Sequence, residues 1–152
     1  MLFLGQADAT IDAKQRLAIP SKFRNQHPGT DTEKPMWVAV PWPDGKLIRL
    51  YPAPAFMKLA ERLDDTLTPD EDTAQRDATF FSLAEMVEAD TAGRVRLPKR
   101  HLDMVDLSTQ VTVLGVRSRL EIRDRESWLA GDGQRFESLP DLVKRIGSKS
   151  TG

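Results

Sequence analysis

The chain has 152 residues, of which 39% are hydrophobic and 30% are charged, a composition typical of folded globular proteins. Its length lies between one ordinary domain and two very small ones. No apolar run approaches the roughly 18 residues that a membrane span needs, and the amino terminus lacks the basic lead and long apolar core of a secretory signal. We therefore expect a soluble, cytoplasmic protein without a membrane partner.

Metal and redox chemistry have few residues available. The chain has no cysteine, which excludes disulfides, cysteine-based zinc sites and a cysteine nucleophile. Its two histidines, His27 and His101, lie far apart in the sequence and offer little for a metal site. We expect no cofactor and no bound metal.

The charges are unevenly distributed along the chain. The net charge of −1 gives no overall attraction to nucleic acid. The segment 12–24, however, has four basic residues against one acidic residue, and the segment 90–103 has four against two. Between them, 61–77 has seven acidic residues against two arginines. Two basic segments therefore flank an acidic one, and either basic segment could attract DNA locally.

A sequence motif occurs twice, since the segment 10–22 recurs at 88–100 without a gap. In both copies an Asp-x-x-x-Arg motif precedes two alternating apolar residues and a proline. This alternation is the period of a half-buried strand, and the proline cannot donate the next ladder hydrogen bond. The matched residues are Asp12 with Asp90, Arg16 with Arg94, Leu17 with Val95, Ile19 with Leu97, Pro20 with Pro98, and Lys22 with Arg100.

Hairpin turns are expected at 12–15 and 90–93, ahead of these strands. Apolar and polar residues also alternate over 7–11, which predicts a strand on the other side of the first turn. Gly93 can adopt a positive φ at no steric cost. The first copy has Gln15 at that position, so we expect its turn to be strained or of another type.

Each copy continues with a short basic helix and a second pair of strands. We therefore predict an α+β protein built from two β-rich modules, each running strand, turn, strand, short helix, strand, turn, strand. The modules are expected over 5–54 and 84–127. Their short helices are expected at 21–24 and 99–102, and their second strand pairs at 37–40 with 47–51 and at 111–115 with 120–122.

A helical connector is expected over 55–83. The first helix follows Pro54, a favourable first-turn residue. The sequence Thr68-Pro69-Asp70-Glu71 has the form of a capping box, which predicts that a second helix begins at Thr68. The apolar positions are Phe56, Leu59, Ala60 and Leu63 in the first helix and Ala74, Ala78 and Phe81 in the second.

A C-terminal helix and tail are expected over 128–152. Asp124 is placed to cap a short helix that carries Trp128. A second helix is predicted to start near Ser138 and Asp141 and to stop at Gly147, with disorder from Ser148 onward. This helix is expected to bury Leu139, Leu142, Val143 and Ile146.

The doubled motif resembles the MraZ family of bacterial transcriptional regulators. The resemblance rests on 11–17 followed by 19–24, and on 90–94 followed by Leu97-Pro98, and it extends over 3–128. The chain departs from the family at three places. Gln15 stands where the family usually has glycine, a short polar insertion lies at 27–34, and Arg123 stands where an aromatic residue often occurs.

The resemblance implies a fold, an assembly and a function. The implied fold is two tandem SpoVT-AbrB-type swapped-hairpin modules, also described as a double-split β-barrel, packed as one unit with connecting helices. The implied assembly is a ring of identical subunits. The implied function is repression at promoter repeats upstream of the division and cell-wall gene cluster, by a protein that binds double-stranded DNA at the nucleoid.

The candidate DNA contacts are Lys14, Arg16, Arg94 and Arg96. An arginine at the end of a hairpin can make a bidentate contact with guanine in the major groove, and nearby lysines can bind phosphates. Asp12 and Asp90 have two interpretations, since a carboxylate in a turn can simply fix the local bend. The other basic residues, Lys22, Arg24, Lys99 and Arg100, remain open between phosphate contact and solvation.

Two other classes of function compete with DNA binding. One is an enzyme in which Asp12, Asp90 and His101 share an acid–base site, in the manner of a carboxylate-dependent hydrolase. The sequence has no nucleophile elbow, phosphate loop or metal-ligand spacing, so we expect no enzyme and no small-molecule substrate. The other is an antitoxin-like or architectural oligomer built on the same module.

The sequence also suggests self-assembly. Small modules of this kind leave edge strands to be covered, which favours a closed oligomer. The three tryptophans, Trp37, Trp42 and Trp128, exceed what so small a core needs. They are expected to pack in the core or between subunits rather than to stack on bases.

Overall fold

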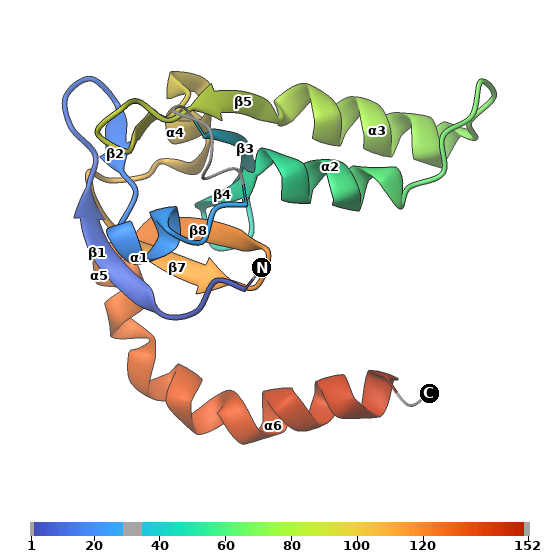
Figure 1. Ribbon diagram of the computed structural model, residues 1–152. Helices are drawn as coiled ribbons and strands as arrows, with labels where there is room; N and C mark the ends of the chain where they lie inside the picture. Colours follow the sequence, from blue (N-terminus) through green and yellow to red (C-terminus); the bar gives the residue numbers. More distant parts are fainter. Residues whose placement is uncertain (1, 29–34, 151–152) are drawn as a thin grey trace.

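The computed structural model describes residues 2–28 and 35–150 and is a mixed α+β fold with antiparallel sheets (Figure 1). Part of the predicted 27–34 insertion lies outside the described residues. Both copies of the repeat have the predicted order of two strands, a short helix and two strands. The first copy has β1 (Gln6–Thr10), β2 (Arg16–Ala18), α1 (Ser21–Arg24), β3 (Met36–Trp42) and β4 (Leu47–Pro52). The second has β5 (Glu85–Glu88), β6 (Arg94–Arg96), α4 (Lys99–Val105), β7 (Gln110–Val116) and β8 (Arg119–Asp124).

The two copies exchange their first strands. The large sheet has the order β1-β7-β8-β4-β3-β5, so β1 of the first copy pairs with β7 of the second, and β5 of the second pairs with β3 of the first. The remaining strands, β2 and β6, pair with each other in a two-stranded sheet. The predicted swapped-hairpin fold is confirmed, because each copy completes its sheet with a strand of the other.

The predicted hairpins extend over less chain than expected. In each copy a single isolated bridge joins the residue before the turn to a residue after it, Ile11 to Leu17 in the first copy and Ala89 to Val95 in the second. The second strand then leaves its neighbour to pair with the other copy. Two single bridges therefore connect the small sheet to the large one, and no continuous ladder closes a barrel in the described residues.

We call the β2–β6 pair, with its flanking turns, the ribbon. Arg16 pairs with Arg96, Leu17 with Val95, and Ala18 with Arg94. Two further hydrogen bonds extend the ribbon symmetrically, from Ile19 N to Gly93 O at 3.0 Å and from Leu97 N to Gln15 O at 2.9 Å. A half-turn rotation about the Leu17–Val95 pair places each ribbon residue on the matched residue of the other copy. The ribbon therefore has a local twofold symmetry.

One hydrophobic core is shared by both copies, and a second, smaller cluster lies beside the connector helices. Leu17 and Val95 are fully buried on the inner face of the ribbon. Side chains of a strand alternate between faces, so burying these two turns their neighbours outward. Each such burial contributes roughly 1.5–3 kcal/mol. The inner face packs in one cluster with residues of both copies that include Phe3, Phe23, Trp37, Ile48, Leu50, Leu97, Leu120 and Ile122.

Two helices, α2 (Ala53–Glu61) and α3 (Glu71–Leu83), form a hairpin that projects from the body (Figure 1). The predicted start of α3 at Thr68 is wrong by two residues. Asp70 is the N-cap, since its carboxylate accepts a hydrogen bond from Thr73 N at 2.7 Å and satisfies a first-turn amide. The predicted connector helices are otherwise present, although Leu63 lies beyond the end of α2.

The C-terminal helices are α5 (Arg125–Ala130) and α6 (Asp132–Ser150). Asp124 caps α5 as predicted, accepting from Ser127 N at 2.9 Å. The prediction for α6 is wrong in three respects. The helix starts earlier, continues through Pro140 and past Gly147, and remains helical at 148–150, whereas 151–152 lie outside the described residues. Pro140 removes one hydrogen bond without ending the helix.

The apolar residues of α6 are exposed rather than buried. The exposed fractions are 54% for Leu139, 47% for Leu142, 60% for Val143 and 68% for Ile146. The sequence pattern shows that a helix has an apolar face, but it does not show which surface covers that face. None of the helices in the described part of the chain has the length and apolarity to cross a membrane.

We predict that Gln15→Gly stabilises the protein. Gln15 has a φ of 67°, close to the 77° of Gly93 at the matched position, so the first turn has the same form as the second but carries a side chain in the left-handed region. Relief of that strain, less the entropy that glycine adds to the unfolded chain, is expected to raise the free energy of unfolding by up to about 1 kcal/mol. Urea unfolding measures this change.

Gly93→Ala is the matched control. A Cβ at Gly93 would collide with the side chain of Arg24, so this substitution is expected to destabilise the protein. A lower free energy of unfolding for Gln15→Gly would contradict the assignment of strain to Gln15.

Candidate nucleic-acid interface

The first turn is built around the Asp12 carboxylate. One carboxylate oxygen accepts hydrogen bonds from the backbone N–H groups of Lys14 and Arg16, both at 2.9 Å. The other oxygen accepts from the Nε of Arg16 at 2.8 Å. The Asp12 N–H donates to Arg16 O at 3.0 Å and closes the turn. A single aspartate thus fixes both the turn and the arginine that follows it.

The second copy repeats this arrangement. Asp90 accepts from the N–H groups of Ala92 and Arg94 and from the Nε of Arg94, all at 2.9 Å. In each copy the backbone N–H of the motif arginine is the main cause that lowers the aspartate's pKa below its ordinary value; burial opposes this shift, and the guanidinium hydrogen bond lowers the pKa further. Both carboxylates are therefore ionised at neutral pH.

Each Asp–Arg pair orients a guanidinium and leaves its outer edge available. The aspartate takes the Nε of Arg16 or Arg94, so both terminal amino groups stay outside the ion pair. The arginine side chains are partly exposed, with 29% of Arg16 and 38% of Arg94 accessible. Two terminal amino groups held in one plane suit a bidentate contact to two acceptors, such as O6 and N7 of guanine.

The ribbon brings three arginines together on its outer face. Arg16 and Arg96 are direct partners across the ribbon, and Arg94 lies two residues from Arg96, about 7 Å along the strand. Leu17 and Val95 point to the core, so their neighbours point outward, and Arg94 and Arg96 share one face of the strand. Arg96 is exposed and makes no ion pair among the described residues.

The two halves of this outer face differ in charge. Ala18 in the first copy stands where the second copy has Arg96, and Ala92 in the second stands where the first has Lys14. Lys14 is exposed at the tip of the first turn. The structure therefore places the four basic residues predicted from the sequence, Lys14, Arg16, Arg94 and Arg96, on the ribbon and its turns.

Two other basic residues have structural partners that the sequence did not indicate. Lys22 donates from Nζ to Gln6 O at 2.6 Å, and Arg24 donates from Nη1 to Ala92 O at 3.4 Å. Arg24 therefore supports the second turn from the first copy. The contact of Arg24 with Ala92 joins the two copies and follows from the strand exchange, which local patterns did not specify.

The residues of the alternative acid–base site do not act together. Asp12 and Asp90 are each occupied by their own turn. His101 is fully buried, and its Nε2 lies 2.7 Å from Leu83 O. Burial is the main cause that lowers the pKa of His101, so the ring is neutral at neutral pH. The carboxylate beside its Nε2 is that of Glu85, at 3.7 Å, so the structure does not bring Asp12, Asp90 and His101 together in one site.

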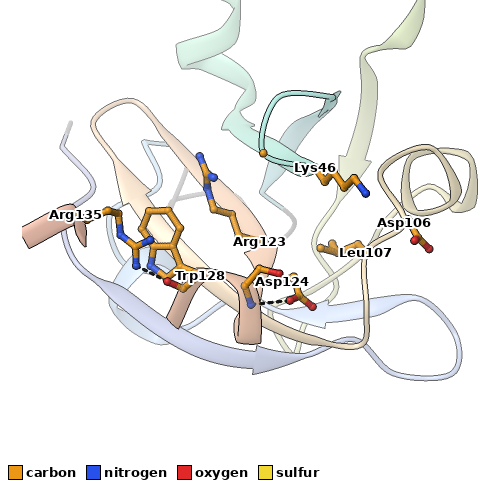
Figure 2. A pocket seen from close by; sticks show the side chains of 9 residues that line it. Lys46, Asp106, Leu107, Arg123, Asp124, Trp128 and Arg135 are labelled. Carbon is orange, nitrogen blue, oxygen red and sulfur yellow. Dashed lines mark hydrogen bonds between the residues drawn. The ribbon is translucent and has the colours of Figure 1, made fainter. Parts of the chain in front are cut away.

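A second cationic surface lies beside Trp128, at a hollow of about 410 Å³ (Figure 2). Its arginines are already engaged. Arg123 donates to the buried Glu121 at 2.8 Å and lies 4.8 Å from the Trp128 ring, and Arg135 stacks on the same ring at 3.4 Å and donates to Trp128 O. This cluster joins the sheet to α6, and its two guanidinium groups are already engaged by the protein, unlike the terminal amino groups of the ribbon arginines.

The tryptophans divide between core and surface. Trp37 is buried in the shared core as predicted. Trp42 and Trp128 are only partly buried, and both lie under arginines, Trp42 under Arg49 at 3.8 Å. These two therefore lie outside the core, each covered by a guanidinium, and packing between subunits stays a prediction for them.

A comparison with known families finds a match over the second copy of the repeat. Residues 80–134 match a family described as "MraZ protein, putative antitoxin-like". The match runs from the end of α3 to the first turn of α6 and includes the Asp90 turn and β6. This family is not described as an enzyme family.

We predict that Asp12 and Asp90 titrate below the ordinary aspartate pKa of 3.8. Because their folded-state pKa values are lowered, the stabilisation that they give is complete above the ordinary value and is lost as the pH falls through the lowered values. Carboxyl ¹³C NMR during acidification measures both titrations. In Arg16→Met the pKa of Asp12 should rise while that of Asp90 stays in place. Titration of both carboxyls at or above 3.8 would contradict the proposed turn.

Proposed function

We propose that this chain, which matches the MraZ family over residues 80–134, is a sequence-specific DNA-binding transcriptional regulator whose ribbon reads the major groove. The observation that carries the proposal is the outer face of the ribbon, with Arg16, Arg94 and Arg96 together and two of them oriented by aspartates. The match to this family supports the class of regulator, and the ribbon supports the surface that it uses.

The ribbon suits the major groove in shape. That groove admits a two-stranded β-ribbon, and its floor carries the acceptors that distinguish guanine. The arginines of the ribbon are spaced at about 7 Å along a strand, close to two base-pair steps of roughly 3.4 Å each. Lys14, at the tip of a turn, is placed to contact a phosphate and fix the register.

Orientation by the aspartates lowers the entropic penalty of binding. An arginine side chain that is free in solution loses up to about 2 kcal/mol of conformational entropy when it is fixed. In Arg16 and Arg94 much of this loss already occurs in the folded protein, because Nε is bonded to the carboxylate. Base recognition then requires little further ordering.

The finer role that we propose is repression at promoter repeats upstream of the division and cell-wall gene cluster. In this proposal the protein acts in the cytoplasm at the nucleoid, as a ring of identical subunits. A ring would present several ribbons to successive repeats, so that each bound element raises the effective concentration of the next contact. The surfaces left uncovered on α3 and α6 support an assembly.

We predict that Arg16→Ala, Arg94→Ala and Arg96→Ala each weaken binding to a duplex carrying these repeats while the protein remains folded. Loss of a bidentate base contact is expected to reduce affinity by about 1–3 kcal/mol, or roughly 5- to 150-fold. Fluorescence anisotropy at several salt concentrations measures the affinity, and circular dichroism checks the fold.

Arg76→Ala is the matched control, since Arg76 is an exposed arginine of α3 that pairs with Asp77, also by a carboxylate contact. It should bind as the unmodified protein does. A shuffled duplex distinguishes specific from phosphate-dominated binding, because only specific binding retains its preference as salt rises. Equal affinity for the two duplexes at all salt concentrations would overturn the proposal.

An antitoxin-like oligomer is a second candidate, favoured by the description of the matched family. The same measurement separates the two candidates. A protein whose module serves only to bind a partner protein should show no preference for the repeated sequence, whereas a regulator should lose that preference when the ribbon arginines are removed.

A further inference from the structure

An arginine from the first copy crosses the second turn of the ribbon. Arg24 is the last residue of α1, and its Nη1 donates to Ala92 O at 3.4 Å. A Cβ placed on Gly93 would lie 2.5 Å from Cδ and 3.0 Å from Cζ of Arg24. Gly93 is buried as a result, although it belongs to a turn. The absence of a side chain at Gly93 therefore makes room for an arginine that the other copy supplies.

The first turn does not receive a charge in this way. The residue of the second copy that matches Arg24 is Leu102, which is partly buried and packs against the shared core. Gln15 stands where the second turn has Gly93, and its side chain is partly exposed. A leucine cannot supply a cation to the first turn, so a charged side chain from the opposite copy is a feature of the second turn.

This difference compensates for another difference between the turns. The first turn has Lys14, which is exposed at its tip, whereas the second turn has Ala92 at the matched position. The guanidinium of Arg24 reaches the carbonyl of this same Ala92. Each turn thus combines an aspartate, the arginine bound to it and one further cation. That cation belongs to the turn itself in the first copy and comes from α1 at the second turn.

Arg24 is held in place and still has donors available. Phe23, its neighbour in α1, is fully buried in the shared core, and the N–H of Arg24 donates to Pro20 O at 3.1 Å. The side chain of Arg24 is exposed and makes no ion pair among the described residues. A guanidinium has five N–H donors, and the contact with Ala92 uses one of its three nitrogens. The remaining nitrogens can donate to an anion.

The position of Arg24 suits a phosphate rather than a base. Arg16, Arg94 and Arg96 project from the outer face of the ribbon, whereas Arg24 reaches it from another element and lies over a turn. The two turns lie at opposite ends of the ribbon, because β2 and β6 are antiparallel. In complexes with DNA, arginine and lysine contacts to phosphates fix the register of a protein on the duplex, while base contacts specify the sequence.

We propose that Arg24 binds a backbone phosphate of the duplex beside the second turn, in place of the lysine that this turn lacks. Lys14 binds a phosphate at the opposite end of the ribbon, so both ends are held while the ribbon arginines reach the bases between them. This inference rests on the DNA-binding function proposed above, and it assigns to that function a residue outside the ribbon.

The first test removes the charge of Arg24. Arg24→Met keeps an unbranched side chain over Gly93, and Arg24→Gln keeps a hydrogen-bond donor. Fluorescence anisotropy with a duplex that carries one repeat should show an affinity about fivefold lower for both variants near roughly 0.15 M salt. The slope of log affinity against log salt should decrease by about 0.9, the value for one lost phosphate contact. A shuffled duplex should lose affinity by the same factor, because phosphates carry no sequence information.

The second test returns the charge at a different position. Ala92 is exposed, and the first turn, which has the same form, carries Lys14 at the matched position. Ala92→Lys is therefore expected to fit the turn. In the Arg24→Met background it should restore the affinity to within about twofold and recover the salt dependence. A residue that acts only by shaping the turn could not be replaced by a lysine at a different position.

Arg76→Met is the matched control, since Arg76 is an exposed arginine of α3, and it should retain both the affinity and the salt slope. Circular dichroism should be unchanged in every variant. An unchanged salt slope in Arg24→Met and Arg24→Gln, or a loss of affinity that Ala92→Lys does not recover, would overturn the proposal. A loss of sequence preference in place of a uniform loss would also overturn it, because Arg24 would then act through the shape of the turn.

Arg16→Ala and Arg94→Ala separate this inference from the function on which it rests. If these two variants lose their preference for the repeat while Arg24→Met binds as the unmodified protein does, the phosphate contact alone is rejected. If neither ribbon variant changes the binding of the repeat, the ribbon is not the DNA-binding surface, and the proposed function is rejected together with the role of Arg24.

Discussion

The pairing of Leu17 with Val95 is the contact on which the remaining structure depends. It joins the two copies of the repeat, buries one face of the ribbon in a core that both copies share, and turns Arg16, Arg94 and Arg96 outward together. A strand has only two faces, so an apolar residue fixed inward commits its neighbours to solvent. The basic surface therefore results from the way in which the core is completed.

The aspartates set how this surface is presented. Asp12 and Asp90 satisfy the turn amides with one oxygen and the arginine Nε with the other, so a single side chain shapes the loop and orients the guanidinium. The structural and functional interpretations of these aspartates are therefore compatible. The two halves of the ribbon share this aspartate–arginine contact. The first copy has Ala18 where the second has Arg96, and Lys14 where the second has Ala92, so the ribbon is symmetric in backbone and asymmetric in charge.

Much of this could be predicted from sequence because it is local. The repeat located both turns, the apolar alternation located the strands, and Asp124 located a helix start. The exchange of β1 and β5 between copies was available only through the family resemblance, since alternation defines the faces of a strand but not its partner. Local patterns also missed the role of Arg24, which contacts the other copy, and misplaced the start of α3, where Asp70 rather than Thr68 caps the helix. The exposure of α6 could not be predicted, because periodicity does not reveal what lies opposite an apolar face.

The central claim is that the terminal amino groups of the ribbon arginines contact bases while their Nε atoms stay on the aspartates. Side-chain ¹⁵N NMR of the arginines during titration with a specific duplex tests this claim most directly. We expect the Nη signals of Arg16, Arg94 and Arg96 to shift and sharpen, and the Nε signals of Arg16 and Arg94 to change little. Shifts confined to arginines of the helices, or loss of the Nε–aspartate hydrogen bonds on binding, would contradict the account.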